Sequence, residues 1–220
     1  MLKLENTVTP SPEQWEAVIR GMRNPMNSWD KSDTDYHLRS TAIGKADHEL
    51  MMKLSSAGSD HAKFRRMIPV YVDIVAPLYW WKEFDTYKVG TVANSCSTMH
   101  KIHEKEFSLD DFSHEKMHLT NIDGGLHSGC VSMLEKVIDV LNGMRTQYLI
   151  TGNKFYWDNI IQLLPTSYNQ RRTVMLNYEV LANIYKARRN HKLSEWHTFC
   201  DWIETCLPYS EFITGGKNNA

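Results

Sequence analysis

The chain has 220 residues and a formal net charge of −1, with 25 lysines and arginines against 26 aspartates and glutamates. This balance argues against a general nucleic-acid binder, which usually carries a basic excess or a dense basic stripe. With 42% apolar and 11% aromatic residues, the chain can form a core and is not disordered. Because no uninterrupted apolar stretch approaches about 18 residues, the sequence predicts no membrane span.

The cysteines form neither a C-x-x-C pair nor a zinc-ribbon spacing. They are Cys96, Cys130, Cys200 and Cys206. The N-terminal segment also lacks the basic-then-apolar pattern of a signal peptide. Free thiols in a reducing cytoplasm are therefore the expected state of the protein.

The first predicted element is a helix that begins after a capping box, with Ser11 as the cap and Gln14 three residues later. Residues 24–44 are polar and turn-rich, which predicts a long loop of the kind that often carries function. A second helix is predicted over about residues 45–57, with Gly58 as its stop signal.

Residues 66–75 alternate and are rich in β-branched side chains, which predicts a strand. The Ala-Pro that follows breaks this strand and begins an aromatic helix over residues 78–84. Its neighbouring Trp80 and Trp81 are interpreted as core or subunit-interface residues. Residues 86–120 are polar and predict a mixture of strand and irregular loop.

From about residue 129 onward the apolar spacing is helical. The predicted helices cover residues 131–150, 155–164, 173–190 and 193–207. The sequence contains no internal repeat and no linker that would divide it. We therefore expect one α+β domain over residues 1–214, helix-rich at its C-terminal end, followed by a flexible tail over residues 215–220.

One short motif suggests a metal. His114, Glu115 and His118 match H-E-x-x-H, in which two histidines one turn apart bind zinc and the glutamate acts as a base. Charged residues precede the motif and a Gly-Gly pair follows it, whereas a zincin helix is apolar around the motif. An exposed polar helix is the alternative, and we predict no metal site.

A basic cluster near the C-terminal helices has two interpretations. Its members are Arg171, Arg172, Lys186, Arg188, Arg189 and Lys192. Cations at the end of a helix complement the helix dipole, which is a purely structural role. Arginine forks also match phosphate geometry, so the same residues could hold a nucleotide.

Residues 165–208 resemble the C-terminal half of the flavin-dependent thymidylate synthases, the ThyX family. The family pattern is a proline, then N-x5-N-x4-R, then a Trp-containing helix. The matching positions, with one extra residue before the last, are Pro165, Asn177, Asn183, Arg188 and Trp196. The segment IVAPLYWWKEF also matches the family's strand, Ala-Pro and aromatic helix, so the resemblance covers most of the chain.

This resemblance implies an α+β domain with a central mixed or antiparallel sheet, assembled as a homotetramer. The family's sites lie at subunit interfaces and bind FAD, the pyrimidine nucleotide dUMP, methylene-tetrahydrofolate and NADPH, and the product is dTMP. By resemblance, the cofactor-binding residues here are Asn177, Asn183, Arg188 and His191, the last displaced by one position. Arg188 is also expected to hold or polarise the nucleotide.

The chain departs from the family's RHR-x7-S signature. Thr86, Tyr87 and Lys88 stand where the family has RHR, and Cys96 replaces the serine. The residues predicted to line the substrate side are Glu83, Lys88, Thr91 and Asn94, of which the first and last also replace family residues. Each lost charge-assisted contact is worth roughly 1.5–3 kcal/mol, so thymidylate synthesis is not expected at the family's efficiency.

Cys96 suggests a hypothesis of its own. A thiolate is a better nucleophile than a hydroxyl, so Cys96 could add to a pyrimidine carbon and act as a catalytic residue with Arg188. The alternative is a small buried residue without a role. Taken together, the sequence predicts FAD-linked methyl or methylene transfer to a dUMP-like nucleotide; the alternative is a non-catalytic relative that uses the scaffold for binding or assembly.

Overall fold

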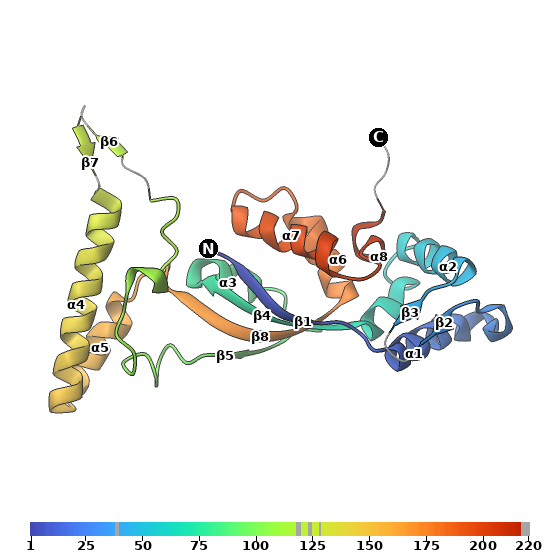
Figure 1. Cartoon of the computed structure of the whole chain (residues 1–220), viewed down its shortest axis with the longest axis horizontal. Helices are drawn as coiled ribbons and strands as arrows, with labels where there is room; N and C mark the ends of the chain where they lie inside the picture. The colour runs from blue at the N-terminus through green and yellow to red at the C-terminus, as the bar shows by residue number, and fades with distance from the viewer. Residues whose placement is uncertain (38–39, 118–119, 123–124, 128, 217–220) are drawn as a thin grey trace. The chain divides into compact units, whose positions relative to one another are not determined.

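A computed structural model of the chain describes residues 1–37, 40–117, 120–122, 125–127 and 129–216 (Figure 1). It is 53% helical around a central antiparallel sheet, which confirms the predicted α+β class. The strands of this sheet, in spatial order, are β1 (Lys3–Val8), β4 (Pro69–Pro77), β8 (Asn169–Asn177) and β5 (Val92–Ser95). Two small antiparallel pairs accompany it: β2 (Asp35–Tyr36) with β3 (Thr41–Ala42), and β6 (Thr120–Ile122) with β7 (Gly125–His127).

The chain forms two compact units. Unit 1 consists of Met1–Lys3, Val75–Thr86 and Ser95–Arg172. Unit 2 consists of Leu4–Ile74, Tyr87–Asn94 and Thr173–Ala220. All four strands of the central sheet contribute residues to both units. In the part of the chain that the structure describes, no helix is long and apolar enough to cross a membrane.

Unit 1 is built on three helices, α3 (Leu78–Phe84), α4 (Gly129–Thr151) and α5 (Lys154–Leu163). In α4, Leu134, Ile138 and Leu141 are buried because the i, i+4, i+7 spacing places them on one face of the helix. In α3, Trp80 and Trp81 are fully buried, so of the two predicted roles, core or subunit interface, the structure shows the core.

Unit 2 contains the remaining α-helices and a 3₁₀ helix of 6 residues. They are α1 (Pro12–Arg23), α2 (Lys45–Ser56), the 3₁₀ helix Ala62–Met67, α6 (Tyr178–Arg188), α7 (Ser194–Cys206) and α8 (Glu211–Thr214). The predicted capping box of α1 is present, because Ser11 Oγ accepts from Gln14 N and Gln14 Oε1 accepts from Ser11 N. Gly58 has a φ of +100°, which confirms it as the stop after α2.

The predicted helix over residues 173–190 is wrong in its first part. Residues 173–177 belong to strand β8, in which Gln170, Val174 and Leu176 are buried at even spacing. Helix α6 begins only after Asn177. The apolar spacing of this run fits either a helix or a strand. It forms a strand because β8 pairs with β4 on one side and with β5 on the other. The strand predicted over 66–75 also begins later, at Pro69.

The segment 24–44 is not simply a long loop, because it contains two short 3₁₀ helices and the β2–β3 pair. A buried carboxylate fixes this segment: Asp47 is fully buried and accepts from Arg23 Nε at 2.6 Å. It also accepts from Ser32 Oγ at 2.7 Å and Thr34 Oγ1 at 2.6 Å. Burial raises the pKa of Asp47, but these hydrogen bonds and the Arg23 charge outweigh it and hold that pKa below its ordinary value.

Candidate functional site

The predicted site residues are divided between the units. Unit 1 holds Glu83 and Cys96. Unit 2 holds Lys88, Thr91, Asn94, Asn177, Asn183, Arg188 and His191. In unit 2 they gather on helix α6, on the segment Tyr87–Asn94 and on the turn after α6, so α6 is the element from which the candidate site is built.

Arg188, at the C-terminal end of α6, contacts two aromatic rings that meet at a corner. Its guanidinium carbon lies 4.9 Å from the ring centre of Trp196 and 5.6 Å from that of Tyr87. Its Nε donates to Tyr87 Oη at 2.9 Å. The rings of Tyr87 and Trp196 meet edge to face at 6.1 Å. We call this set of three residues the arginine clamp. Cation–π contacts and a charge-assisted hydrogen bond therefore fix the guanidinium in one place.

Asn177, at the other end of α6, is the N-cap of that helix. Its Oδ1 accepts from Val180 N at 3.0 Å, so the side chain satisfies one of the helix's unpaired N–H groups. Gly90 packs directly on it: a Cβ at Gly90 would come within 3.0 Å of Asn177 Nδ2. The position that matches a flavin-binding asparagine by resemblance thus has a local structural role.

The substrate-side residues of unit 2 lie along the segment that follows Tyr87. Lys88 and Asn94 are exposed, and Asn94 belongs to β5. Thr91 is half-buried, and its hydroxyl oxygen is buried without a hydrogen-bond partner among the described residues. A buried hydroxyl without a partner is rare in proteins.

Asn183 faces a pocket of about 520 Å³ in unit 2, on a different side of α6 from Arg188. Five residues along a helix correspond to about 140° around its axis, which explains why the two side chains diverge. The polar residues that line this pocket are Ser55, Ser56, Ser59, Arg65, Glu179, Asn183, Tyr185, Lys186, Arg189 and Thr214. We call it the α6 pocket.

Two ion-pair networks shape the wall of the α6 pocket. Arg65 pairs with Glu179 at 2.9 Å. Arg189 pairs with Asp201 at 2.5 Å and reaches Glu204 at 3.4 Å. Burial, and then the hydrogen bond from Tyr185 to Glu204, raise the pKa of Tyr185 to about 12. Tyr185 is protonated at neutral pH, as an unshifted tyrosine is, and lines the pocket as a neutral group.

His191 lies in the turn between α6 and α7. Its Nδ1 accepts from Leu193 N at 3.2 Å, and its carbonyl oxygen accepts from His197 Nε2 at 2.6 Å. Its ring contacts that of Trp196 at 6.4 Å. The displaced histidine therefore adjoins the arginine clamp through Trp196, and its contacts order the turn into α7.

Cys96, in unit 1, is exposed, so its alternative interpretation as a small buried residue is wrong. Its backbone is fixed on both sides, because its N–H donates to Arg171 O at 2.9 Å and its carbonyl accepts from Gln170 Nε2 at 2.7 Å. The backbone carbonyl of Glu83 accepts from both the N–H and the hydroxyl of Thr86. The thiol of Cys96 is accessible on a well-held strand end.

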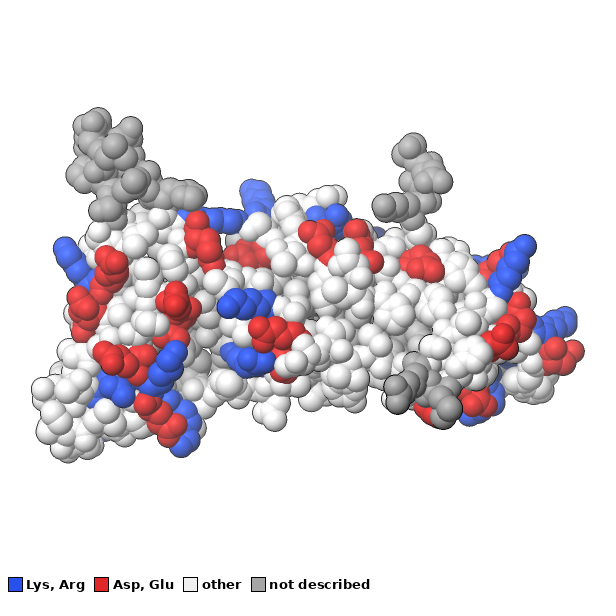
Figure 2. Space-filling view, viewed as in Figure 1, with Lys and Arg blue, Asp and Glu red and all other residues white. Residues whose placement is uncertain are grey.

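Arg172 of the basic cluster has a structural role in unit 1. Its guanidinium carbon lies 4.1 Å from the ring centre of Trp81, and its Nη1 donates to Asp85 at 2.7 Å. Its Nε also donates to Gln170 Oε1 at 3.0 Å. Over the face of the molecule shown in Figure 2, basic and acidic side chains are interspersed rather than separated by sign.

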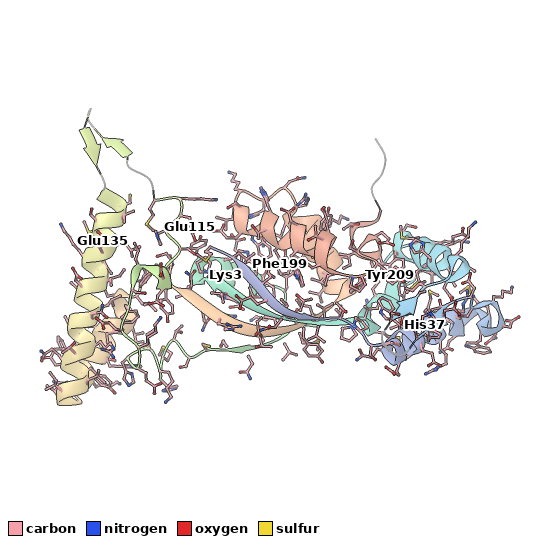
Figure 3. All side chains as sticks on the ribbon, viewed as in Figure 1. Lys3, His37, Glu115, Glu135, Phe199 and Tyr209 are labelled. Atoms are coloured by element: carbon pink, nitrogen blue, oxygen red, sulfur yellow. The ribbon has the colours of Figure 1, made fainter. Side chains whose placement is uncertain are left out.

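The zinc hypothesis gains no support from the residues that the structure describes. Glu115, labelled in Figure 3, forms an ion pair with the N-terminal amino group of Met1 at 3.0 Å. His114 Nδ1 is hydrogen-bonded to the carbonyl oxygen of Phe112 at 2.9 Å. His118 lies outside the described residues. Within the described ranges, no group of three or more His, Cys, Asp or Glu side chains could hold a metal ion.

The sequence analysis missed three contributors to the site. Tyr87 was noted only as a departure from the family signature, and Ser55 and Gly90 were not considered. Two local signals could have pointed to them: Gly90 is a glycine in a polar turn, and Tyr87 is an aromatic residue at a position of the family signature. The contact between Tyr87 and Arg188 joins residues 101 positions apart, and no local pattern predicts such a pair.

At the level of fold, the chain has the architecture of the flavin-dependent thymidylate synthases. No protein-family model matches its sequence, and no curated protein matches it. The structural likeness extends over nearly the whole chain and is therefore not confined to one unit.

Two of the similar solved structures are of thymidylate synthase X (ThyX) from Helicobacter pylori with FAD and dUMP. One is 14% identical with a TM-score of 0.64, covering 96% of this chain and 94% of that chain. The other is 15% identical with a TM-score of 0.61, covering 96% and 95%. A third similar structure is the UMP/dUMP methylase PolB from Streptomyces cacaoi bound with 5-Br dUMP, at 14% identity, a TM-score of 0.63, and coverage of 93% and 88%. At such low identities, the likeness shows a shared fold.

Proposed function

We propose that the chain binds a flavin and a pyrimidine nucleotide and catalyses methyl or methylene transfer to a dUMP-like substrate. One observation carries the proposal: a single helix, α6, presents Asn183 to the polar α6 pocket and Arg188 in a fixed clamp. The similar structures, two with FAD and dUMP and one with 5-Br dUMP, support the same pair of ligands.

The α6 pocket suits the polar part of FAD. Its volume of about 520 Å³ lies within the roughly 300–1,000 Å³ that is usual for ligand sites. Ser55 also lines the pocket. The Asn183 amide and the Lys186 ammonium add donors for ribityl and phosphate oxygens. A bound flavin would supply the reducing equivalents for the transferred one-carbon group.

Arg188 is the proposed nucleotide residue. A guanidinium is a fixed cation with donors in one plane, so it can pair with a phosphate or stabilise charge on a pyrimidine carbonyl oxygen. Lys88, exposed on the segment next to Tyr87, offers a second cation. Arg188 matches an arginine of the family pattern, whereas Lys88 is the only cation where the family has RHR, so we expect weaker nucleotide binding than in the family.

Cys96 stays a hypothetical nucleophile toward a pyrimidine carbon, and its exposure leaves the thiol accessible to a ligand. Turnover would also need a one-carbon donor such as methylene-tetrahydrofolate and a reductant such as NADPH. We further propose that the protein works in the cytoplasm, where its four free cysteines stay reduced.

A homotetramer is the proposed assembly. Helices α4 and α5 expose large apolar side chains: Met133, Val140, Leu149, Ile150 and Phe155 are between 45% and 72% exposed. Large apolar side chains that one chain leaves exposed are candidates for subunit contacts. Light scattering coupled to gel filtration tests the assembly, and a monomeric mass would contradict it.

The first experiment is the visible absorbance spectrum of the purified protein, repeated after addition of FAD and desalting. We expect a flavin band that stays with the wild-type protein and is lost in Asn183→Ala. Gln147→Ala removes an exposed amide of unit 1 and serves as the matched control. A protein that stays colourless after incubation with FAD would contradict the flavin proposal.

A second candidate function is a non-catalytic scaffold for binding or assembly. One observation favours it: Asn177 caps α6 and Arg188 packs against two rings, so both residues have structural roles that need no ligand. Their retention at the family spacing is thus explained by folding alone. A protein that binds neither FAD nor dUMP would favour this candidate.

A further inference from the structure

We propose that Tyr87 is a positioning residue that acts through Arg188, holding the guanidinium in the orientation that binds the nucleotide. The inference rests on the proposed function, because it assumes that Arg188 contacts dUMP. It goes beyond that function because Tyr87 stands at a position where this chain departs from the RHR signature.

The geometry of the arginine clamp supports this role. Tyr87 makes two contacts with Arg188: its hydroxyl accepts from Nε at 2.9 Å, and its ring lies 5.6 Å from the guanidinium carbon. A hydrogen bond at Nε constrains the rotation of the guanidinium plane. The terminal nitrogens are the atoms that fork onto a phosphate or carbonyl, so this bond contributes to their direction.

Trp196 forms the rigid side of the clamp. It is fully buried and meets Phe199 edge to face at 5.9 Å, so its ring cannot follow a moving arginine. Tyr87 belongs to the segment Tyr87–Asn94, which also packs on α6 at Gly90. The arginine is therefore enclosed by one wall from α7 and one from a segment anchored on α6.

Preorganisation explains why this matters for binding. A free arginine side chain loses rotamer freedom when it grips an anion, and a side chain already held in place loses less. In this chain the segment that should carry the family arginines has only Lys88. A single well-oriented arginine is then the main cationic contact, and its orientation becomes correspondingly important.

The test is a double-mutant cycle read by dUMP affinity, using calorimetric titration of the flavin-loaded protein. Tyr87→Phe keeps the ring and removes the hydroxyl. We expect it to weaken dUMP binding about tenfold, the effect of one hydrogen bond to a charged group. In the Arg188→Lys background, which has no Nε donor of that geometry, Tyr87→Phe should change the affinity less than twofold.

The matched control is Tyr71→Phe, because Tyr71 is 46% exposed in the same unit and lies outside the clamp. A second readout needs no nucleotide: the Nε–H proton signal of Arg188 should exchange slowly with water in the wild type and rapidly in Tyr87→Phe. A structural role of Tyr87 would lower the melting temperature without this specific change.

The outcomes are distinguishable. Equal dUMP affinity of Tyr87→Phe and wild type overturns the inference and leaves the proposed function intact. A tenfold loss in both backgrounds also overturns it, because Tyr87 would then act independently of Arg188. A wild-type protein that retains FAD and binds no dUMP overturns the nucleotide half of the proposed function, and the inference with it.

Discussion

Substitutions at Asn177 separate a structural role from a cofactor role at one residue. The side chain caps α6 through a 3.0 Å hydrogen bond from Val180 N to Oδ1. Asn177→Ala removes this acceptor and leaves the backbone N–H of Val180 without it. This loss lowers the free energy of unfolding by about 0.5–2 kcal/mol. For a chain of this size, 1 kcal/mol corresponds to a fall of about 2–4 °C in melting temperature.

Asn177→Asp keeps the capping oxygen and adds a negative charge beside the helix N-terminus, which is favourable by about 0.3–1 kcal/mol. We therefore expect the aspartate variant to melt at or above the wild-type temperature and the alanine variant to melt below it. Thermal unfolding followed by tryptophan fluorescence measures both. If the aspartate variant were as unstable as the alanine variant, the capping argument would be refuted.

The same two variants report on the flavin. If Asn177 also holds FAD through its amide N–H, both variants should retain less flavin after desalting, because neither keeps the donor. If the residue only caps the helix, Asn177→Asp should retain the wild-type amount. Flavin retention is thus independent of the melting result, and the two roles can be assigned separately.

Four further predictions concern Gly90, the buried carboxylate of Asp47 and the thiol of Cys96. Gly90→Ala should destabilise the fold by about 1–2 kcal/mol, measured by thermal unfolding, because φ is +78° and a Cβ would crowd the Asn177 amide. Asp47→Ala breaks a buried ion pair and should cost about 3–5 kcal/mol in urea unfolding, against less than about 0.5 kcal/mol for the exposed Glu49→Ala. Because the folded-state pKa of Asp47 is lowered, its stabilisation should be complete at neutral pH and disappear as the pH falls through that pKa. Cys96→Ser should keep FAD and dUMP binding and lose turnover; unchanged turnover would exclude the thiol as nucleophile.

Local signals in the sequence predicted much of the fold. The capping box at Ser11 and the glycine after α2 each act within one helical turn, so they could be recognised without knowledge of the neighbours. The run Thr173–Asn177 could not be assigned in this way. Its apolar spacing fits a helix or a strand, and only pairing with the neighbouring strands distinguishes the two.

The surroundings of the candidate site residues could be predicted only in part from the sequence, and their binding roles stay predictions. The spacing of Asn183 and Arg188 identified α6, and the α6 pocket and the clamp now give each side chain its surroundings. The position of Tyr87 over Arg188 depends on a contact between distant segments, which the sequence does not encode locally. The same holds for the exposure of Cys96, because burial is decided by tertiary packing.

The five-residue interval between Asn183 and Arg188 also limits how this protein can change length. Insertion of one residue between them would rotate everything that follows by about 100° and advance it by about 1.5 Å along the axis. Arg188 would then leave Tyr87, while Asn183 stayed at its pocket. A point substitution can change one face of α6 and leave the other in place. An insertion or deletion inside this interval would instead change the angle between Asn183 and Arg188 around the helix axis.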